Sequence, residues 1–192
     1  MPIAKSKQTV RSLCADVRPE FVEDFLTRLD EDYFETFSAE EISSHIRMSR
    51  RVDNDQRVLL TVKPIPDNEF EITLVGYDYP SGFSILCGLL SSFGLDIRTG
   101  EIHSFSRQSS GRQPGRIVDV LKVVSNPSEP FDAARQSKFE WELLGLTDLL
   151  ATGSFAEARE RLNRTLIERV EIMGERLAGL ISPVDLSFDN RS

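Results

Sequence analysis

Between residues 70 and 94 the spacing of apolar residues changes from every second position to every third or fourth. Apolar and polar side chains first alternate through Phe70, Ile72 and Leu74, which is the pattern of a half-buried strand. After a segment rich in turn-forming residues, a wide apolar stripe follows at helical spacing and ends at Gly94, a residue suited to the position after a helix. A strand, a short connection and a helix are therefore predicted in direct succession.

More strands and two long helices are expected after this first helix. The predicted elements are strands at 95–105 and 117–124, a polar hairpin at 106–115 between them, helices at 131–150 and 155–180, and a short strand at 184–188. A slip of the alternation near Gly100 indicates a bulge. Apolar residues occupy both faces of the strand at 117–124, as in a central or interface strand. The chain is therefore predicted to be an α+β protein.

Upstream of this region, two helices and a brief strand are predicted. One helix covers 19–29, with Pro19 in its first turn. A second begins at Ser38, which forms a capping box with Glu41. A strand is expected at 57–62. We accordingly divide the chain into an N-terminal helical segment and linker, 1–66, and a second domain, 67–192.

Composition and charge exclude several classes of partner. Lys and Arg total 23 against 31 Asp and Glu, so the net charge of −8 has the wrong sign for a nucleic-acid-binding protein. The sequence has no apolar run long enough for a signal peptide or a membrane span. Cys14 and Cys87 are far apart and carry no CxxC motif, which is typical of reduced thiols. We expect a cytoplasmic protein with no membrane partner.

No catalytic or metal-binding motif is evident, so we expect neither catalysis nor a cofactor nor a metal within these residues. The acidic pairs Asp30/Asp32 and Asp53/Asp55 have the spacing of a nucleotidyltransferase site, but the glycine turn that should precede them is missing, since Gly76 is the first glycine. Both pairs are interpreted as exposed turn acids. The two histidines, His45 and His103, are interpreted as structural, and Phe139 and Trp141 as core residues of one helical stripe.

The best candidate for a binding site is the loop from Asp78 to Gly82. It leads from the end of a strand into the N-terminus of a helix, where free backbone N–H groups and the helix dipole attract a carboxylate or a phosphate. The alternative is an ordinary turn between a strand and a helix.

The run from 71 to 86, EITLVGYDYPSGFSIL, resembles the opening of an ACT domain, in which a strand ends in Asp-x-Pro-Gly-Leu-Phe and a helix follows. Phe93-Gly94-Leu95-Asp96-Ile97 is similar to the Gly-x-Asn-Ile of that family, and the segment 117–123, IVDVLKV, to its third strand. The flanks narrow the resemblance: residues 32–45 are similar to the segment before the first ACT domain of bacterial PII uridylyltransferases, and 184–192 to the junction where a second ACT domain begins.

The resemblance implies a ferredoxin-like βαββαβ domain with an antiparallel sheet, closed by the strand at 184–188 after a long helical insertion at 131–180. It also implies a regulatory module that binds an amino acid, with glutamine as the first candidate. The ligand-binding residues that it indicates are Asp78, Pro80, Ser81, Gly82, Phe83 and Asp96. The ligand carboxylate would meet the N–H groups near Ser81, Gly82 and Phe83, and its ammonium would meet Asp78 or Asp96.

The implied partner is another ACT domain, either in a second copy or in a longer chain. Two alternatives stay open beside the sensory module. In the first alternative, the chain is the leading part of a larger enzyme. That enzyme would be a nucleotidyltransferase that resembles PII uridylyltransferase or glutamine synthetase adenylyltransferase, or a large glutamate dehydrogenase. In the second alternative, the chain is a dimerisation domain that needs no ligand.

Overall fold

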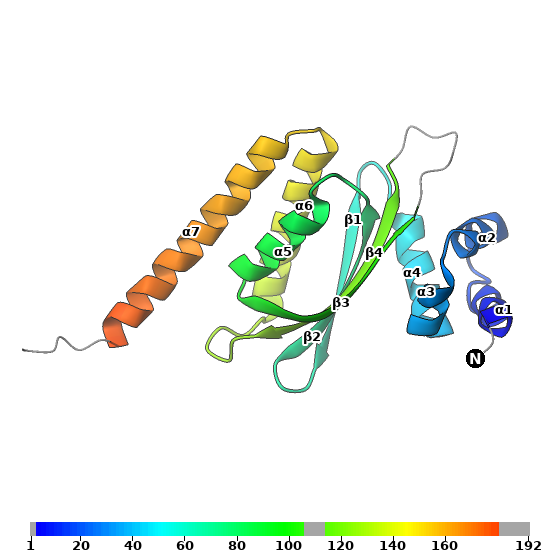
Figure 1. Cartoon of the computed structure of the whole chain (residues 1–192), viewed down its shortest axis with the longest axis horizontal. Helices are drawn as coiled ribbons and strands as arrows, with labels where there is room; N and C mark the ends of the chain where they lie inside the picture. Colours follow the sequence, from blue (N-terminus) through cyan, green and yellow to red (C-terminus); the bar gives the residue numbers. More distant parts are fainter. Residues whose placement is uncertain (1–2, 106–113, 181–192) are drawn as a thin grey trace, which may run out of the picture.

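A computed structural model describes residues 3–105 and 114–180, and these residues form an α+β protein (Figure 1). In chain order the elements are α1 (Ile3–Leu13), α2 (Pro19–Thr27), α3 (Glu31–Thr36), α4 (Ala39–Arg51), β1 (Val58–Ile65), β2 (Glu69–Tyr77), α5 (Gly82–Ser92), β3 (Leu95–Phe105), β4 (Arg116–Ser125), α6 (Ala133–Ala151) and α7 (Phe155–Leu180). The four strands form one antiparallel sheet in the order β1-β2-β4-β3. Helices lie on both sides of this sheet, α1 to α4 on one side and α5 to α7 on the other (Figure 1).

The predicted succession of strand, helix, strand and strand from residue 69 to residue 124 is confirmed. β4 lies between β2 and β3, so α5 connects two parallel strands that are not neighbours. α5 ends as predicted, because Gly94 follows it with φ +67°, a left-handed conformation that glycine adopts without strain. The register of β3 shifts between Ile97 and Thr99, close to the bulge expected at Gly100. The arrangement is compatible with a ferredoxin-like fold.

β1 forms one edge of the sheet, although it was not predicted to belong to this sheet. It pairs with β2 along its whole length, from Val58 opposite Gly76 to Ile65 opposite Glu69. β1 thus occupies the edge beside β2, and it lies on the N-terminal side of the domain boundary expected at residue 66. The strand expected at 184–188 lies outside the described residues.

The helices α1 to α4 cover one face of the sheet through a separate apolar core. Buried side chains from these helices pack against Leu59, Val75, Tyr77, Phe105 and Val118. The capping box that begins α4 is present: the Glu41 N–H donates to Ser38 Oγ, and the Ser38 N–H donates to the Glu41 carboxylate. Neither α1 nor α3 was predicted from the sequence. α1 is a largely polar segment, and α3 has only six residues, so both depend on tertiary packing.

Arg116 connects the sheet to α4. Its guanidinium donates to the backbone oxygen and the hydroxyl of Ser49 and lies over the rings of Phe21 and Tyr77, each at 5.6 Å from guanidinium carbon to ring centre. Cations are favourable at a helix C-terminus, where backbone carbonyls lack partners. Arg116 therefore fixes the N-terminal helices on the sheet.

α6 and α7 complete the second core on the other face of the sheet. Both helices occupy nearly the predicted ranges. Phe139 is fully buried in this core, as expected. The expectation for Trp141 is wrong: its side chain is 63% exposed, and the Arg161 guanidinium lies over its ring at 4.9 Å. None of the helices in the described part of the chain is both long enough and apolar enough to span a membrane.

Candidate functional site

The loop between β2 and α5 is fixed by backbone hydrogen bonds at both ends. The Asp78 N–H donates to the Gly115 oxygen at 2.7 Å, and the Gly82 N–H donates to the Tyr79 oxygen at 2.9 Å. Ser81 stands at the N-cap position of α5 with φ +65°, and its side chain makes no capping hydrogen bond. The first turn of α5 therefore lacks the side-chain acceptor that usually satisfies its N–H groups.

The loop presents an open surface beside that first turn. Pro80 and Ser81 are exposed, and the Phe83 side chain is 45% exposed. A Cβ atom added at Gly82 would meet no heavy atom within 4 Å. The open space at Gly82 is compatible with close approach of an outside molecule to the backbone, which is the role that the sequence assigned to this segment.

Asp96 lies at the other end of the sheet from this loop. Tyr77, next to Asp78, pairs with Arg116, whereas Asp96 pairs with Val124 at the opposite end of β4. Eight residue steps along a strand correspond to roughly 26 Å. Within one chain the structure therefore brings Asp78, Pro80, Ser81, Gly82 and Phe83 together and leaves Asp96 apart from them, because α5 carries the chain back along the sheet.

A cavity of about 30 Å³ lies beneath the loop, between the sheet and the helices α5 and α6. Its lining is apolar except for Tyr77, Tyr79, Asp119 and Thr147. Gly82, at the start of α5, also contributes to the lining. The candidate binding loop and a buried polar site therefore adjoin each other.

Asp119 is the one carboxyl group in the described lining of this cavity. It lies on β4 between Leu74 of β2 and Ile102 of β3, on the face whose next residues, Leu121 and Val123, belong to the second core. The side chain is 1% exposed, and its Oδ1 has no hydrogen-bond partner among the described residues. A buried carboxyl oxygen without a partner is costly and is uncommon in native structures.

Burial raises the pKa of Asp119 to about 7, and the negative charge of Asp78 acts in the same direction. The Cys87 thiol on α5 has a raised pKa, mainly because of burial and also because of the Asp119 charge. A carboxyl group that titrates near neutral pH beside a cavity is a candidate for function. The sequence signal was a single acid in an otherwise apolar stretch of β4, and it was not recognised as a site residue.

Tyr79 joins the cavity to an ion pair at its side. Burial raises the Tyr79 pKa, while a hydrogen bond from Arg57 opposes that increase. Arg57 also donates to the Asp148 carboxylate of α6 at 2.6 Å. The Arg57 cation beside Tyr79 is therefore already paired within the chain.

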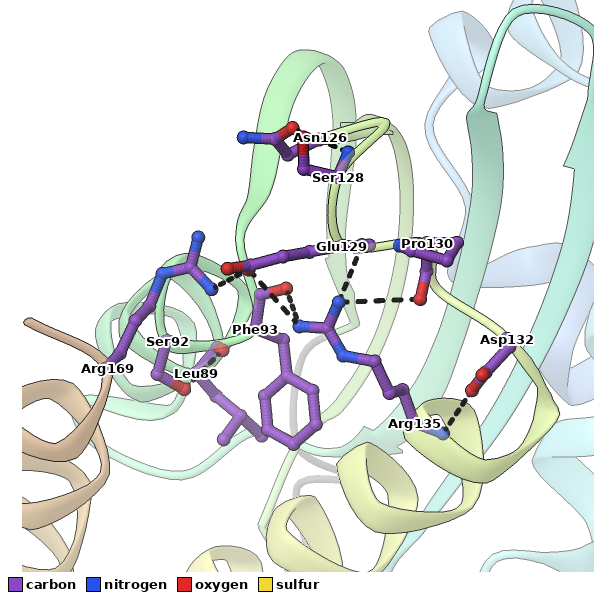
Figure 2. A network of polar contacts seen from close by, with 10 residues as sticks. All are labelled: Leu89, Ser92, Phe93, Asn126, Ser128, Glu129, Pro130, Asp132, Arg135 and Arg169. Carbon is purple, nitrogen blue, oxygen red and sulfur yellow. Dashed lines mark hydrogen bonds and ion pairs between the residues drawn. The ribbon is translucent and has the colours of Figure 1, made fainter. Parts of the chain in front are cut away.

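A larger cavity, of about 360 Å³, lies at the other end of α5. Figure 2 shows the polar network at this place, in which Arg135 donates to the Phe93 and Glu129 backbone oxygens, both at 2.6 Å. Arg169 of α7 contacts the Glu129 carboxylate at 2.8 Å (Figure 2). Because these two arginines bind protein oxygens, the network explains how α5, α6 and α7 are joined and does not indicate a ligand.

The groove between α6 and α7 has a volume of about 680 Å³ and also contains an ion pair. Arg161 contacts Glu142 at 2.9 Å. Volume alone is a weaker sign of a site than a buried charged group without a partner. The small cavity at Asp119 is therefore the stronger candidate.

The histidines lie on the opposite face of the sheet, around Tyr33. The Tyr33 hydroxyl and His45 Nδ1 form a hydrogen bond of 2.6 Å, and the His103 ring meets the Tyr33 ring edge-on at 4.8 Å. Burial lowers the pKa of His45 to about 4 and also lowers that of His103.

The described residues contain no group of three or more His, Cys, Asp or Glu side chains arranged to hold a metal ion. The Asp53 carboxylate accepts the N–H groups of Asp55 and Gln56, so it has a role in forming a turn.

No protein-family model matches this chain, and no curated protein matches it. Function is therefore inferred from the fold and from the chemistry of the cavity.

Proposed function

We propose that the chain is a regulatory module of the ACT type that binds an amino acid, glutamine first among the candidates, at the loop Asp78–Phe83. The observation that carries the proposal is the uncapped N-terminus of α5 above a cavity with a buried, unpartnered carboxyl group. The order of β2, α5, β3 and β4 supports it further, since it is the order that the resemblance implies.

The carboxylate and the ammonium group of an amino acid each have a partner of opposite polarity at this loop. The N-terminus of α5 offers the positive end of the helix dipole and N–H groups near Ser81 and Phe83 to a carboxylate, while the Gly82 N–H already donates to the Tyr79 oxygen. A carboxyl group adjoins it for the ammonium. Hydrogen bonds between charged and polar groups are the stronger kind, so two such contacts suit a small polar ligand.

The position of the cavity between layers suits regulation. Its walls come from the sheet, α5 and α6, so a ligand that enters it contacts elements from two layers. Such a ligand stabilises the arrangement of the layers in which it makes more contacts. A partner that binds the two arrangements with different affinity is thereby regulated. In this proposal the partner is another ACT domain, in a second copy or in a longer chain, and any catalysis belongs to a nucleotidyltransferase part outside these residues.

Calorimetric titration of the chain with the twenty amino acids tests the proposal. Gly82→Val should weaken binding about tenfold or more, because a branched side chain would occupy the open space at the loop. Gly174→Val on α7 is the matched control, since a Cβ at Gly174 also meets no heavy atom within 4 Å. Binding of none of the amino acids, or equal affinity in Gly82→Val and Gly174→Val, would contradict the proposed site.

One observation favours the dimerisation alternative. β3 is an edge strand, and two of its large apolar residues, Ile97 and Ile102, are exposed. Exposed edge strands pair readily with another chain. Under this alternative, light scattering after size exclusion should give a dimer mass that amino acids do not change, and Ile102→Lys should produce the monomer.

A further inference from the structure

We infer that the cavity beneath Tyr79 receives the ammonium group of the ligand and that Asp119 is its counter-ion, a role that the sequence had given to Asp78 or Asp96. The inference rests on the proposed function and specifies the chemistry of the same site. It restricts the ligand to compounds with a slender primary amine and assigns the recognition of that amine to a residue on β4.

The dimensions of the cavity select a small head group. A space of about 10–15 Å³ admits one water molecule, so the volume of about 30 Å³ admits an ammonium group with part of the carbon that carries it. A guanidinium group or an aromatic ring does not fit such a space. Apolar side chains such as Leu74, Ile85 and Leu143 form the walls, and they suit the methylene or methine group beside the nitrogen.

Two acceptors face the space that the ammonium would occupy. Asp119 Oδ1 has no hydrogen-bond partner among the described residues. Thr147 lines the same cavity and donates its hydroxyl proton to the Leu143 oxygen at 2.8 Å. The remaining lone pairs of that hydroxyl can therefore accept a hydrogen bond from the ligand. An ammonium group has three donors and no acceptor, which matches this pair.

Among the described residues, no cation fills the role of counter-ion. The described lining contains no lysine or arginine. Arg57, which lies beside Tyr79, is committed to Asp148 of α6. Among the described residues, the other ionisable groups that act on Asp119 or line its cavity are Asp78, Tyr77, Tyr79 and Cys87, and none of them is a cation. Because a buried carboxylate needs a positive partner, the ligand supplies the missing charge.

Binding should be coupled to release of a proton. The Asp119 pKa of about 7 means that about a tenth of the carboxyl groups are ionised at pH 6 and about nine tenths at pH 8. Since only the ionised form attracts an ammonium group, affinity should rise about tenfold from pH 6 to pH 8. About one proton should leave for each ligand bound at pH 6, and about a tenth of one at pH 8.

Titration calorimetry of the full chain with L-glutamine tests this chemistry. Measurements at pH 6 and pH 8, in two buffers of different ionisation enthalpy, report affinity and proton release together. Glutaramate, which is glutamine without its amino group, is the matched ligand. Asp96→Asn tests the rival ammonium contact that the sequence assigned to that residue. Asp119→Asn should weaken glutamine binding tenfold or more, and Thr147→Val about threefold to tenfold.

The inference is supported if glutamine binds with these pH and proton effects, glutaramate binds at least tenfold more weakly, and Asp96→Asn behaves as the wild type. It is overturned, and the proposed function stands, if glutamine binds to the wild type without a proton effect or equally well to Asp119→Asn. The proton measurement uses the wild type alone, so it decides the matter even if Asp119→Asn does not fold. Failure of all twenty amino acids to bind overturns both proposals.

Discussion

Replacement of Asp119 with asparagine should stabilise the folded chain at neutral pH and have little effect in acid. Asparagine has nearly the size of the protonated carboxyl group but cannot ionise. The folded-state pKa of Asp119 is raised from 3.8 to about 7, so the folded chain holds this proton more tightly than the unfolded chain does. Stability from this group is therefore greatest below about pH 4 and is lost as the pH rises to about 7.

The magnitude follows from the two pKa values. They differ by about three, and each unit of pKa corresponds to about 1.36 kcal/mol, so the wild type should lose about 4 kcal/mol relative to Asp119→Asn by pH 7. At pH 4 the difference should be about 1 kcal/mol or less. The side chain is 1% exposed, so solvent does little to reduce this effect. This cost at neutral pH is what a ligand cation would relieve.

Urea unfolding at pH 4, 6 and 8 measures the effect as a difference between the wild type and Asp119→Asn. The comparison is needed because His45, with a pKa lowered to about 4, acts in the opposite direction over an overlapping range. Asp96→Asn changes an exposed residue at the other end of the sheet, so its unfolding free energy should differ little from that of the wild type at every pH. A difference between the wild type and Asp119→Asn that does not grow from pH 4 to pH 8 would refute the assigned burial of this charge.

Three further changes test other parts of the structure. Arg116→Met should lower the unfolding free energy measured in urea by about 2–4 kcal/mol, because it removes hydrogen bonds to the last turn of α4. The control Arg98→Met, on the exposed edge strand, should change that free energy by less than about 0.5 kcal/mol. Gly94→Ala should cost about 1–2 kcal/mol in thermal melting, because φ is +67° there and an added Cβ would also meet the Arg169 guanidinium. Gly82→Ala should cost nothing, since a Cβ there meets no heavy atom within 4 Å; equal effects of the two changes would contradict the strain and the close contact at Gly94. The unfolding free energy of the wild type should fall by up to about 3 kcal/mol relative to that of His45→Asn as the pH falls from 6.5 to 4, because His45 takes up its proton in the unfolded chain first. A difference that does not change with pH would place His45 in contact with solvent.

Local sequence determined the elements whose signals lie within a few residues of one another. The capping box of Ser38 and Glu41 begins α4 where predicted, and Gly94 ends α5 where predicted. Both depend on hydrogen bonds and dihedral angles that span one turn, so a short window of sequence contains all the information. The change from alternating to helical spacing likewise located β2 and α5.

Elements and environments that depend on distant partners were missed or misassigned. α1 has a mostly polar sequence and is held by contacts such as those of the fully buried Val10, which come from other helices. Trp141 was placed in the core by its spacing along α6, yet it is exposed. The hydrophobic pattern of a single helix does not tell how much of its surface a neighbour covers.

The candidate site shows the same division. The sequence by itself determined the loop from Asp78 to Gly82, because a strand, a turn and a helix N-terminus follow one another there. Only the tertiary structure decided which acid adjoins that loop. The strand order β1-β2-β4-β3 places β4 next to β2, so Asp119 lies beneath the loop, whereas the length of α5 carries Asp96 to the far end of the sheet. Pairing between strands is set by the burial of whole faces and by the path of the connecting helix, and neither is encoded in the residues around one acid.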